Sequence, residues 1–172
     1  MDVVLLSENS LKLKIKKTSV IINPNTKTPK NDADVVISTD EDADPTRVND
    51  YRLLISASGE YEVSGLKISA IKEQSGLVFV FSSDGKQIVW STSSVLSKIP
   101  PDRVRECEIA IINANSEIPE NVITAMEPRA IVFYGGMSKS AVQSLGKEST
   151  SSSKISITED KLPEETVLYQ LS

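Results

Sequence analysis

Apolar and charged residues alternate strictly in one segment near the start of the chain. Leu11, Leu13 and Ile15 alternate with three lysines, and this period of two predicts a β-strand with one buried face and one solvent-exposed face. Apolar segments precede and follow it at residues 3–6 and 19–22. We therefore expect the chain to begin with a meander of three short strands.

Turn sequences separate further strand patterns. Residues 59–65 and 66–71 are predicted to pair with glycine at the turn. Residues 76–81 and 87–90 flank an Asp-Gly pair, which is a strong hairpin signal. Between these hairpins and the meander, the sequence predicts a polar loop at 26–32, strands at 33–37 and 53–55, the second of them buried, and a single helical turn within 45–50.

Strand and helix patterns alternate in the second half. Pro119 opens a helix that runs to residue 127, with Ile118, Val122, Ile123 and Met126 on one face. Ser138 is the predicted N-cap of a helix that reaches residue 145. The remaining elements are a short helix at 101–106, strands at 109–112, 130–134, 154–157 and 167–171, and a mobile serine-rich surface loop at 147–153.

This order of elements predicts an α+β fold in one domain, residues 1–172. Hairpins followed by strand–helix alternation favour a sandwich of mostly antiparallel sheets with short helices outside. A chain of this length is long enough to bury a substantial core.

The absence of histidine is the most restrictive feature of the composition. Imidazole is the usual general base near neutral pH and a common zinc ligand, so Ser-His-Asp and Cys-His catalysis are excluded. The single cysteine, Cys107, lies between two glutamates, which raise the pKa of a thiol. The net charge of −5 gives no support to nucleic-acid binding. Apolar runs are too short for a membrane span, so we expect a cytoplasmic protein.

An acidic segment, Ser-Thr-Asp-Glu-Asp-Ala-Asp at residues 38–44, follows the strand predicted at 33–37. Loops that follow buried strands commonly carry the functional residues of such folds. We call residues 38–44 the acidic loop.

Residues 58–68 read Ser-Gly-Glu-Tyr-Glu-Val-Ser-Gly-Leu-Lys-Ile. They resemble the Pro-Gly-Glu-Tyr-Glu-Val-x-Gly pattern of the metallo-β-lactamase superfamily, in its compact bacterial branch of zinc-dependent-hydrolase-like and L-ascorbate-6-phosphate lactonase-like proteins. Three further stretches are similar. Residues 19–38 match a family segment in which a strand, an Asp-Pro turn and a second strand lead into the family motif Ser-His-x-His-x-Asp-His. Residues 86–97 match a family strand that ends in Gly-Asp. Residues 127–136 match a family strand that leads into Pro-x-His.

The resemblance implies a four-layer αββα sandwich with a zinc site in the groove where loops of the two sheets meet. Every aligned ligand position has changed. Thr39, Glu41 and Asp44 stand at the three histidine positions, Ala43 at the metal-binding aspartate, Ser91 and Thr92 at Gly-Asp, and Gly135 near the final histidine. Catalytic zinc needs at least three well-placed ligands, so no zinc cofactor is expected.

Two functions remain open. The first is a non-catalytic protein that has lost its zinc site and serves as an interaction or regulatory module, through a protein partner or self-association. The alternative is a hydrolase or small-anion binder with a hard divalent cation held by Asp40, Asp42 and Asp44, since magnesium and calcium prefer oxygen ligands. An EF-hand loop is excluded because Pro45 and Tyr51 occupy its glycine and glutamate positions.

Overall fold

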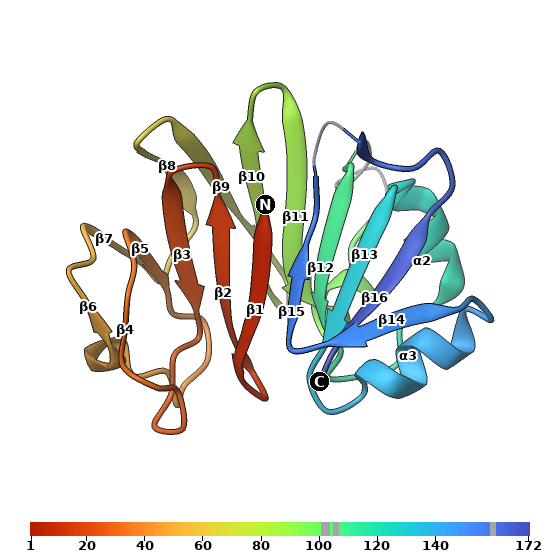
Figure 1. Ribbon diagram of the computed structural model, residues 1–172, viewed down its shortest axis with the longest axis horizontal. Coiled ribbons are helices and arrows are strands. Elements are labelled where there is room, and N and C mark those ends of the chain that lie inside the picture. Colours follow the sequence, from red (N-terminus) through yellow and green to blue (C-terminus); the bar gives the residue numbers. More distant parts are fainter. Residues whose placement is uncertain (101–103, 105–106, 159–160) are drawn as a thin grey trace.

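Two β-sheets stack face to face, and helices cover the outer side of one of them (Figure 1). The computed structural model describes residues 1–100, 104, 107–158 and 161–172. The helix predicted at 101–106 lies largely outside these described residues. The predicted α+β sandwich with short outer helices is confirmed.

The first sheet has six strands in the order β15-β1-β2-β3-β5-β7. These are β1 (Asp2–Ser7), β2 (Ser10–Ile15), β3 (Thr18–Ile22), β5 (Val35–Ile37), β7 (Leu53–Ile55) and β15 (Lys154–Ser156). The predicted meander is confirmed, because β1, β2 and β3 pair antiparallel. Leu11, Leu13 and Ile15 are buried on the inner face, as their alternation indicates.

The second sheet has eight strands in the order β14-β16-β13-β12-β11-β10-β9-β8. These are β8 (Gly59–Val63), β9 (Leu66–Glu73), β10 (Gly76–Ser83), β11 (Lys86–Thr92), β12 (Ile109–Asn113), β13 (Ala130–Tyr134), β14 (Ser149–Ser152) and β16 (Val167–Leu171). Both predicted hairpins form. Asp84 and Gly85 have φ values of 51° and 77°, the left-handed pair that a two-residue hairpin turn requires.

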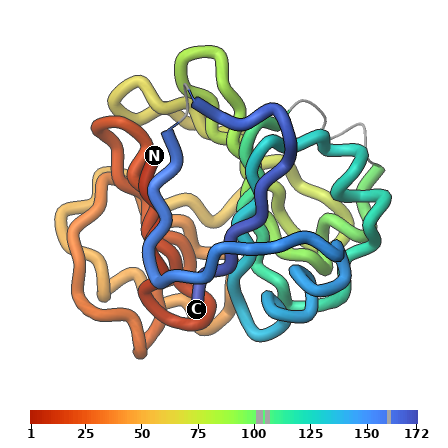
Figure 2. The backbone as a smooth tube through the Cα atoms, turned by 45° about the vertical axis from the view of Figure 1, so that its right-hand side comes forward, coloured from red at the N-terminus to blue at the C-terminus, as the bar shows by residue number. Residues whose placement is uncertain are grey.

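The C-terminal part of the chain joins the two sheets. Strand β15 pairs with β1 in the six-stranded sheet, whereas β14 and β16 belong to the eight-stranded sheet. Figure 2 shows this blue segment beside the red N-terminal strands. The backbone of residues 149–171 therefore contributes strands to both sheets.

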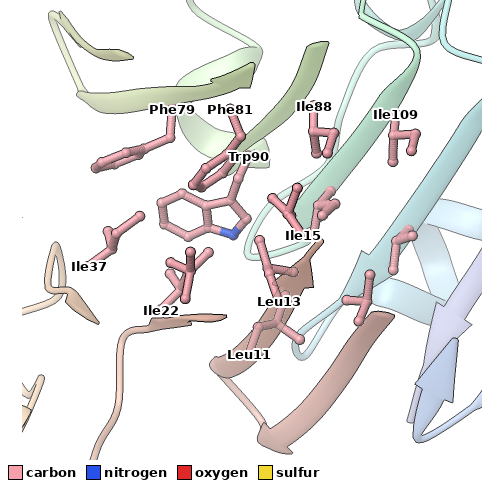
Figure 3. Packing of buried hydrophobic residues seen from close by; sticks show 14 of the residues in the cluster. Leu11, Leu13, Ile15, Ile22, Ile37, Phe79, Phe81, Ile88, Trp90 and Ile109 are labelled. Carbon is pink, nitrogen blue, oxygen red and sulfur yellow. The ribbon is translucent and has the colours of Figure 1, made fainter. Parts of the chain in front are cut away.

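The main core lies between the sheets. Trp90, Phe79 and Phe81 of the eight-stranded sheet face leucine and isoleucine side chains of the six-stranded sheet (Figure 3). The rings of Phe79 and Trp90 are 5.4 Å apart and tilted by 56°, a favourable aromatic arrangement.

A second core lies between the eight-stranded sheet and the helices α1 (Ser93–Leu96), α2 (Glu120–Met126) and α3 (Ser138–Ser144). Val122, Ile123 and Met126 of α2 are buried, which confirms its predicted apolar face. No helix among the described residues is long and apolar enough to cross a bilayer.

The outer face of the six-stranded sheet has a different cover. There, the pair β4 (Asn31–Asp32) and β6 (Val48–Asn49) and the 3-10 turn η1 (Pro45–Arg47) accompany a small cluster of Ile21, Ala33, Val36 and Val48. No α-helix lies in this layer within the described parts of the chain.

Four local predictions differ from the structure. Residues 147–153 contain β14, because backbone pairing with β16 outweighs the loop-like serine composition. Ser138 is the first residue of α3, whose N-cap is Met137 without a side-chain hydrogen bond. Leu54 is 43% exposed because β7 is an edge strand. The sheets are mixed rather than mostly antiparallel, since strands β11, β12, β13, β16 and β14 are parallel neighbours.

Candidate functional site

Loops from both sheets meet at the lower end of the molecule in Figure 1, where β5, β11, β12 and β13 end. Two observations place them together. Asp40 of the acidic loop lies close enough to Tyr134, the last residue of β13, to affect its pKa. Glu8, in the β1–β2 turn, places a carboxylate oxygen 3.3 Å from where a Cβ on Gly136 would lie. We call this region the groove.

The buried amide of Asn23 holds the start of the acidic loop. Its Oδ1 atom accepts hydrogen bonds from the Thr39 amide at 2.8 Å and the Asp40 amide at 3.4 Å. The Asn23 amide group also contacts the Thr39 hydroxyl at 3.0–3.1 Å. Asn23 is 1% exposed and has a φ of 47°, a conformation that asparagine tolerates better than most residues. This amide clamp occupies the Thr39 side chain, which stands at an aligned histidine position.

Asp44 points toward its own helical turn. Its carboxylate accepts hydrogen bonds from the Thr46 amide at 3.0 Å and the Thr46 hydroxyl at 2.6 Å, so it caps η1. Its backbone amide donates to Pro24. The side chain is therefore engaged locally at the third aligned histidine position.

The remaining loop residues face different surroundings. Glu41 is exposed, and Ala43 donates its amide to the Asp40 carbonyl in a turn. Asp42 lines a hollow of about 100 Å³ together with Glu8 and Lys27. Asp40 is half-buried, and burial followed by the Asp42 charge raises the pKa of its carboxyl group, against a hydrogen bond from Thr39. Asp40, Asp42 and Asp44 do not form a group of three carboxylates that could hold a metal ion, since the described residues contain no such group.

The residues at the aligned Gly-Asp position serve the β11–α1 connection. The Ser91 hydroxyl is buried and donates to the Leu77 carbonyl at 2.9 Å. The Thr92 hydroxyl accepts from the Val95 amide at 3.3 Å and caps α1. Both side chains stabilise backbone around the groove.

Gly135 is fixed by its neighbour on β12. It has a φ of 89°, and a Cβ at this position would collide with the side-chain oxygen of Asn113. Asn113 is 4% exposed, and its Oδ1 atom has no hydrogen-bond partner among the described residues. A larger side chain does not fit at Gly135.

A polar network that the sequence did not reveal connects the loops after β11 and β12. The Ser93 hydroxyl accepts from the amides of Asn115 and Ser116 at 3.1 and 2.9 Å. The Asn115 side chain in turn accepts from the Ser94 amide at 3.1 Å. These bonds join segments 22 residues apart in sequence, and only the spatial arrangement discloses them.

A buried hydrogen bond lies beneath the groove. The indole nitrogen of Trp90 donates to the Tyr134 hydroxyl at 2.8 Å. Burial raises the pKa of Tyr134, the Trp90 hydrogen bond opposes this, and the Asp40 charge adds to it. Tyr134 therefore stays neutral at physiological pH.

The donor set does not fit zinc. The described residues include no group of three or more His, Cys, Asp and Glu side chains positioned to hold a metal ion. Cys107 lies in the helix-side core, where burial, with the Glu108 charge, raises the pKa of its thiol to about 12. The aligned positions supply hydroxyls, carboxylates and backbone without imidazole or thiolate, and zinc sites depend on those two ligand types.

The arrangement matches known structures. A Thermotoga maritima protein assigned to the zinc-dependent hydrolases of the metallo-β-lactamase superfamily superposes with a TM-score of 0.78 at 14% identity, over 99% of this chain and 98% of that one. The chain has the metallo-β-lactamase fold. The metallo-β-lactamase fold protein YhfI from Bacillus subtilis superposes with a TM-score of 0.56 at 6% identity, over 98% of this chain and 95% of that one.

A third neighbour is zinc-bound PqqB from Methylobacterium extorquens, with a TM-score of 0.50, 10% identity and coverage of 80% and 81%. No protein-family model matches the sequence, and the curated proteins give no significant match. The likeness therefore lies in the metallo-β-lactamase fold alone.

Proposed function

We propose that this metallo-β-lactamase-fold protein works without zinc, as a non-catalytic interaction or regulatory module. The observation that carries the proposal is the engagement of the side chains at aligned ligand positions. Thr39 is held by Asn23, Asp44 caps η1, and Thr92 caps α1. Moving these groups onto a metal ion would break hydrogen bonds that order the same loops.

The intact fold supports the view that the protein has a function. The sandwich keeps its buried strand faces, its left-handed turn residues and the side-chain caps of α1 and η1, and such agreement between local and global structure is typical of a functional sequence. We propose a protein partner, either a second copy of the chain or a related active enzyme, in the cytoplasm. Nucleic acid and membranes are not proposed as partners.

The hollow beside the acidic loop favours a second candidate function. Asp42 and Glu8 line this small cavity with Asn25 and Lys27, and carboxylates with a neighbouring amide suit a hard cation. A magnesium- or calcium-dependent hydrolase or anion binder would use this corner.

Melting curves separate the two candidates. Protein purified without chelator is heated alone and with zinc, manganese, magnesium or calcium. The proposal predicts no change of melting temperature, because a ligand stabilises only the state that binds it. A rise with magnesium, manganese or calcium that disappears in Asp42→Asn, and persists in the control Asp50→Asn, would favour the second candidate.

Sedimentation equilibrium and affinity purification test the interaction role. We expect concentration-dependent self-association, or stoichiometric co-purification of one protein. A monomer at every concentration that retains no protein would contradict the proposal.

A further inference from the structure

A cavity of about 240 Å³ opens between the two sheets at the upper end of the molecule in Figure 1, opposite the groove. Three two-residue turns surround it: the β2–β3 turn of the six-stranded sheet and the β8–β9 and β10–β11 turns of the eight-stranded sheet. Its lining comes from residues 15–18, 64–66 and 83–84. None of these residues belongs to the acidic loop or to the aligned ligand positions, so the cavity is separate from the groove.

The inner wall of the cavity carries an unused hydroxyl group. Ser83 follows Phe79 and Phe81 on β10, and the period of two places all three side chains on the face between the sheets. Ser83 lines the cavity and is 8% exposed, yet its hydroxyl forms no hydrogen bond with the described residues. Polar side chains at this depth are normally hydrogen-bonded. The unpaired hydroxyl therefore points to a bound group that completes its hydrogen bonding.

Two further donors line the same space. The Ser64 hydroxyl accepts a hydrogen bond from Arg52 at 3.4 Å, so its own proton remains available. Lys17 lines the cavity as well, and it forms no ion pair with the described residues. The Thr18 hydroxyl, in contrast, already donates to the Val63 carbonyl at 3.3 Å. The cavity therefore offers two hydroxyl protons and one ammonium group to a ligand.

An ion pair between Lys16 and Asp84 fixes the net charge of the lining. These two side chains come from different turns and neutralise each other beside the cavity. Lys17 then leaves the lining with one net positive charge. A carboxylate matches this lining, because it carries a single negative charge and two acceptor oxygens. A phosphate monoester carries almost two negative charges at neutral pH, and the second charge would be repelled by Asp84.

We propose that this cavity binds the carboxylate group of a small organic acid. One carboxylate oxygen accepts a hydrogen bond from the Ser83 hydroxyl, and the other lies between Ser64 and the Lys17 ammonium group. The site is independent of the proposed function, because it shares no residue with the groove. A free acid is the intended ligand, since the three surrounding turns leave room for a compact molecule rather than for an extended peptide.

Three small probes test the charge preference. Propionate, propionamide and methyl phosphate are titrated into the full-length protein at constant ionic strength, and amide shifts are followed by ¹H–¹⁵N NMR. We expect saturable shifts at Lys17, Gly65 and Ser83. Propionate should bind about two- to five-fold more tightly than its neutral amide, the ratio that a partly exposed ion pair supplies. Equal binding of propionamide, tighter binding of methyl phosphate, or shifts that do not include these residues would overturn the proposal.

Two variants remove the proposed donors. Ser83→Ala should weaken propionate binding about ten-fold, the effect of losing a hydrogen bond to a charged group. Its melting temperature should stay unchanged, because the hydroxyl forms no hydrogen bond in the free protein. Lys17→Gln should weaken binding about two- to five-fold, whereas the control Lys139→Gln, on α3, should have no effect. Wild-type affinity in Ser83→Ala, or a clear loss of its melting temperature, would contradict the proposal.

Asp84→Asn tests the charge balance without disturbing the turn. Asn-Gly is a favoured sequence for a two-residue hairpin turn, so the β10–β11 hairpin should persist. The variant removes a negative charge from the lining and releases Lys16. We expect tighter binding of propionate and a larger gain for methyl phosphate. Unchanged affinity for both anions would count against a site beside Asp84.

A blocked glutamate, N-acetyl-glutamate N-methylamide, distinguishes a free acid from a protein side chain. It presents the same carboxylate on a chain attached to two amides. We expect clearly weaker binding than that of propionate. Equal or tighter binding would show that the site takes an acidic side chain of a partner protein and would overturn the assignment to a free acid.

Discussion

Replacement of Asn23 is expected to release the acidic loop. In Asn23→Ala, the Thr39 amide loses the acceptor that now lies at 2.8 Å, and an unsatisfied buried donor costs about 1–3 kcal/mol. Alanine must also adopt the φ of 47°, at a further cost of about 1–2 kcal/mol. We therefore expect the free energy of unfolding to fall by about 2–5 kcal/mol, a large part of the stability of an ordinary domain.

Asn23→Gly is the matched control for this prediction. Glycine adopts the left-handed conformation without strain, so its loss should be about 1–3 kcal/mol and should reflect the hydrogen bonds. Urea unfolding, followed by the fluorescence of the single tryptophan, gives both values. Hydrogen exchange at the Thr39 amide measures directly whether the acidic loop stays ordered. A change below about 0.5 kcal/mol in Asn23→Ala, with the Thr39 amide still protected, would refute the reasoning.

Three further predictions concern the surroundings of the groove. Tyr134→Phe leaves the Trp90 indole nitrogen without its acceptor and should lower stability by about 1–3 kcal/mol in urea unfolding; an unchanged midpoint would contradict this. Gly135→Ala introduces a clash and strain, whereas Gly146→Ala, also at positive φ but with open space, adds strain alone, so calorimetry should show the larger drop in melting temperature for the first. The pKa of the Asp40 carboxyl group is raised, so the folded state binds this proton more tightly than the unfolded state does. The contribution of Asp40 to stability therefore falls as the pH rises from the ordinary pKa of the group through the raised pKa. Asp40→Asn should be more stable than the wild type at pH 7 and no more stable at acid pH, and a stability difference that does not depend on pH would count against this.

Local patterns predicted most of the strands. Alternation at Leu11, Leu13 and Ile15 identifies β2 because side chains on a strand repeat every two residues. Asp84 and Gly85 identify a hairpin because their left-handed conformations suit a two-residue turn. In both cases, neighbouring residues contain the necessary information.

Features that depend on distant segments could not be predicted. Strand β14 exists through its pairing with β16, about twenty residues later, and its serine-rich sequence gives no strand signal. The edge position of β7, which exposes Leu54, is likewise a property of the whole sheet.

The candidate site, too, was predicted only in those features that depend on the local sequence. The sequence indicated that the aligned ligand positions carry Thr39, Asp44 and Thr92. It did not indicate that these side chains cap helices or hold loops, because hydrogen-bond partners depend on loop conformation. The Asn23-Pro24 pair is the one sequence signal of the amide clamp, and it predicts only a turn.

Zinc content of the purified protein tests the central claim most directly. The chain is expressed in zinc-supplemented medium, purified without chelator and measured by elemental analysis, and its melting temperature is compared before and after dialysis against EDTA. A loop held by protein hydrogen bonds predicts zinc far below stoichiometric amounts and identical melting temperatures. Stoichiometric zinc that survives gel filtration, with a lower melting temperature after EDTA, would contradict the account.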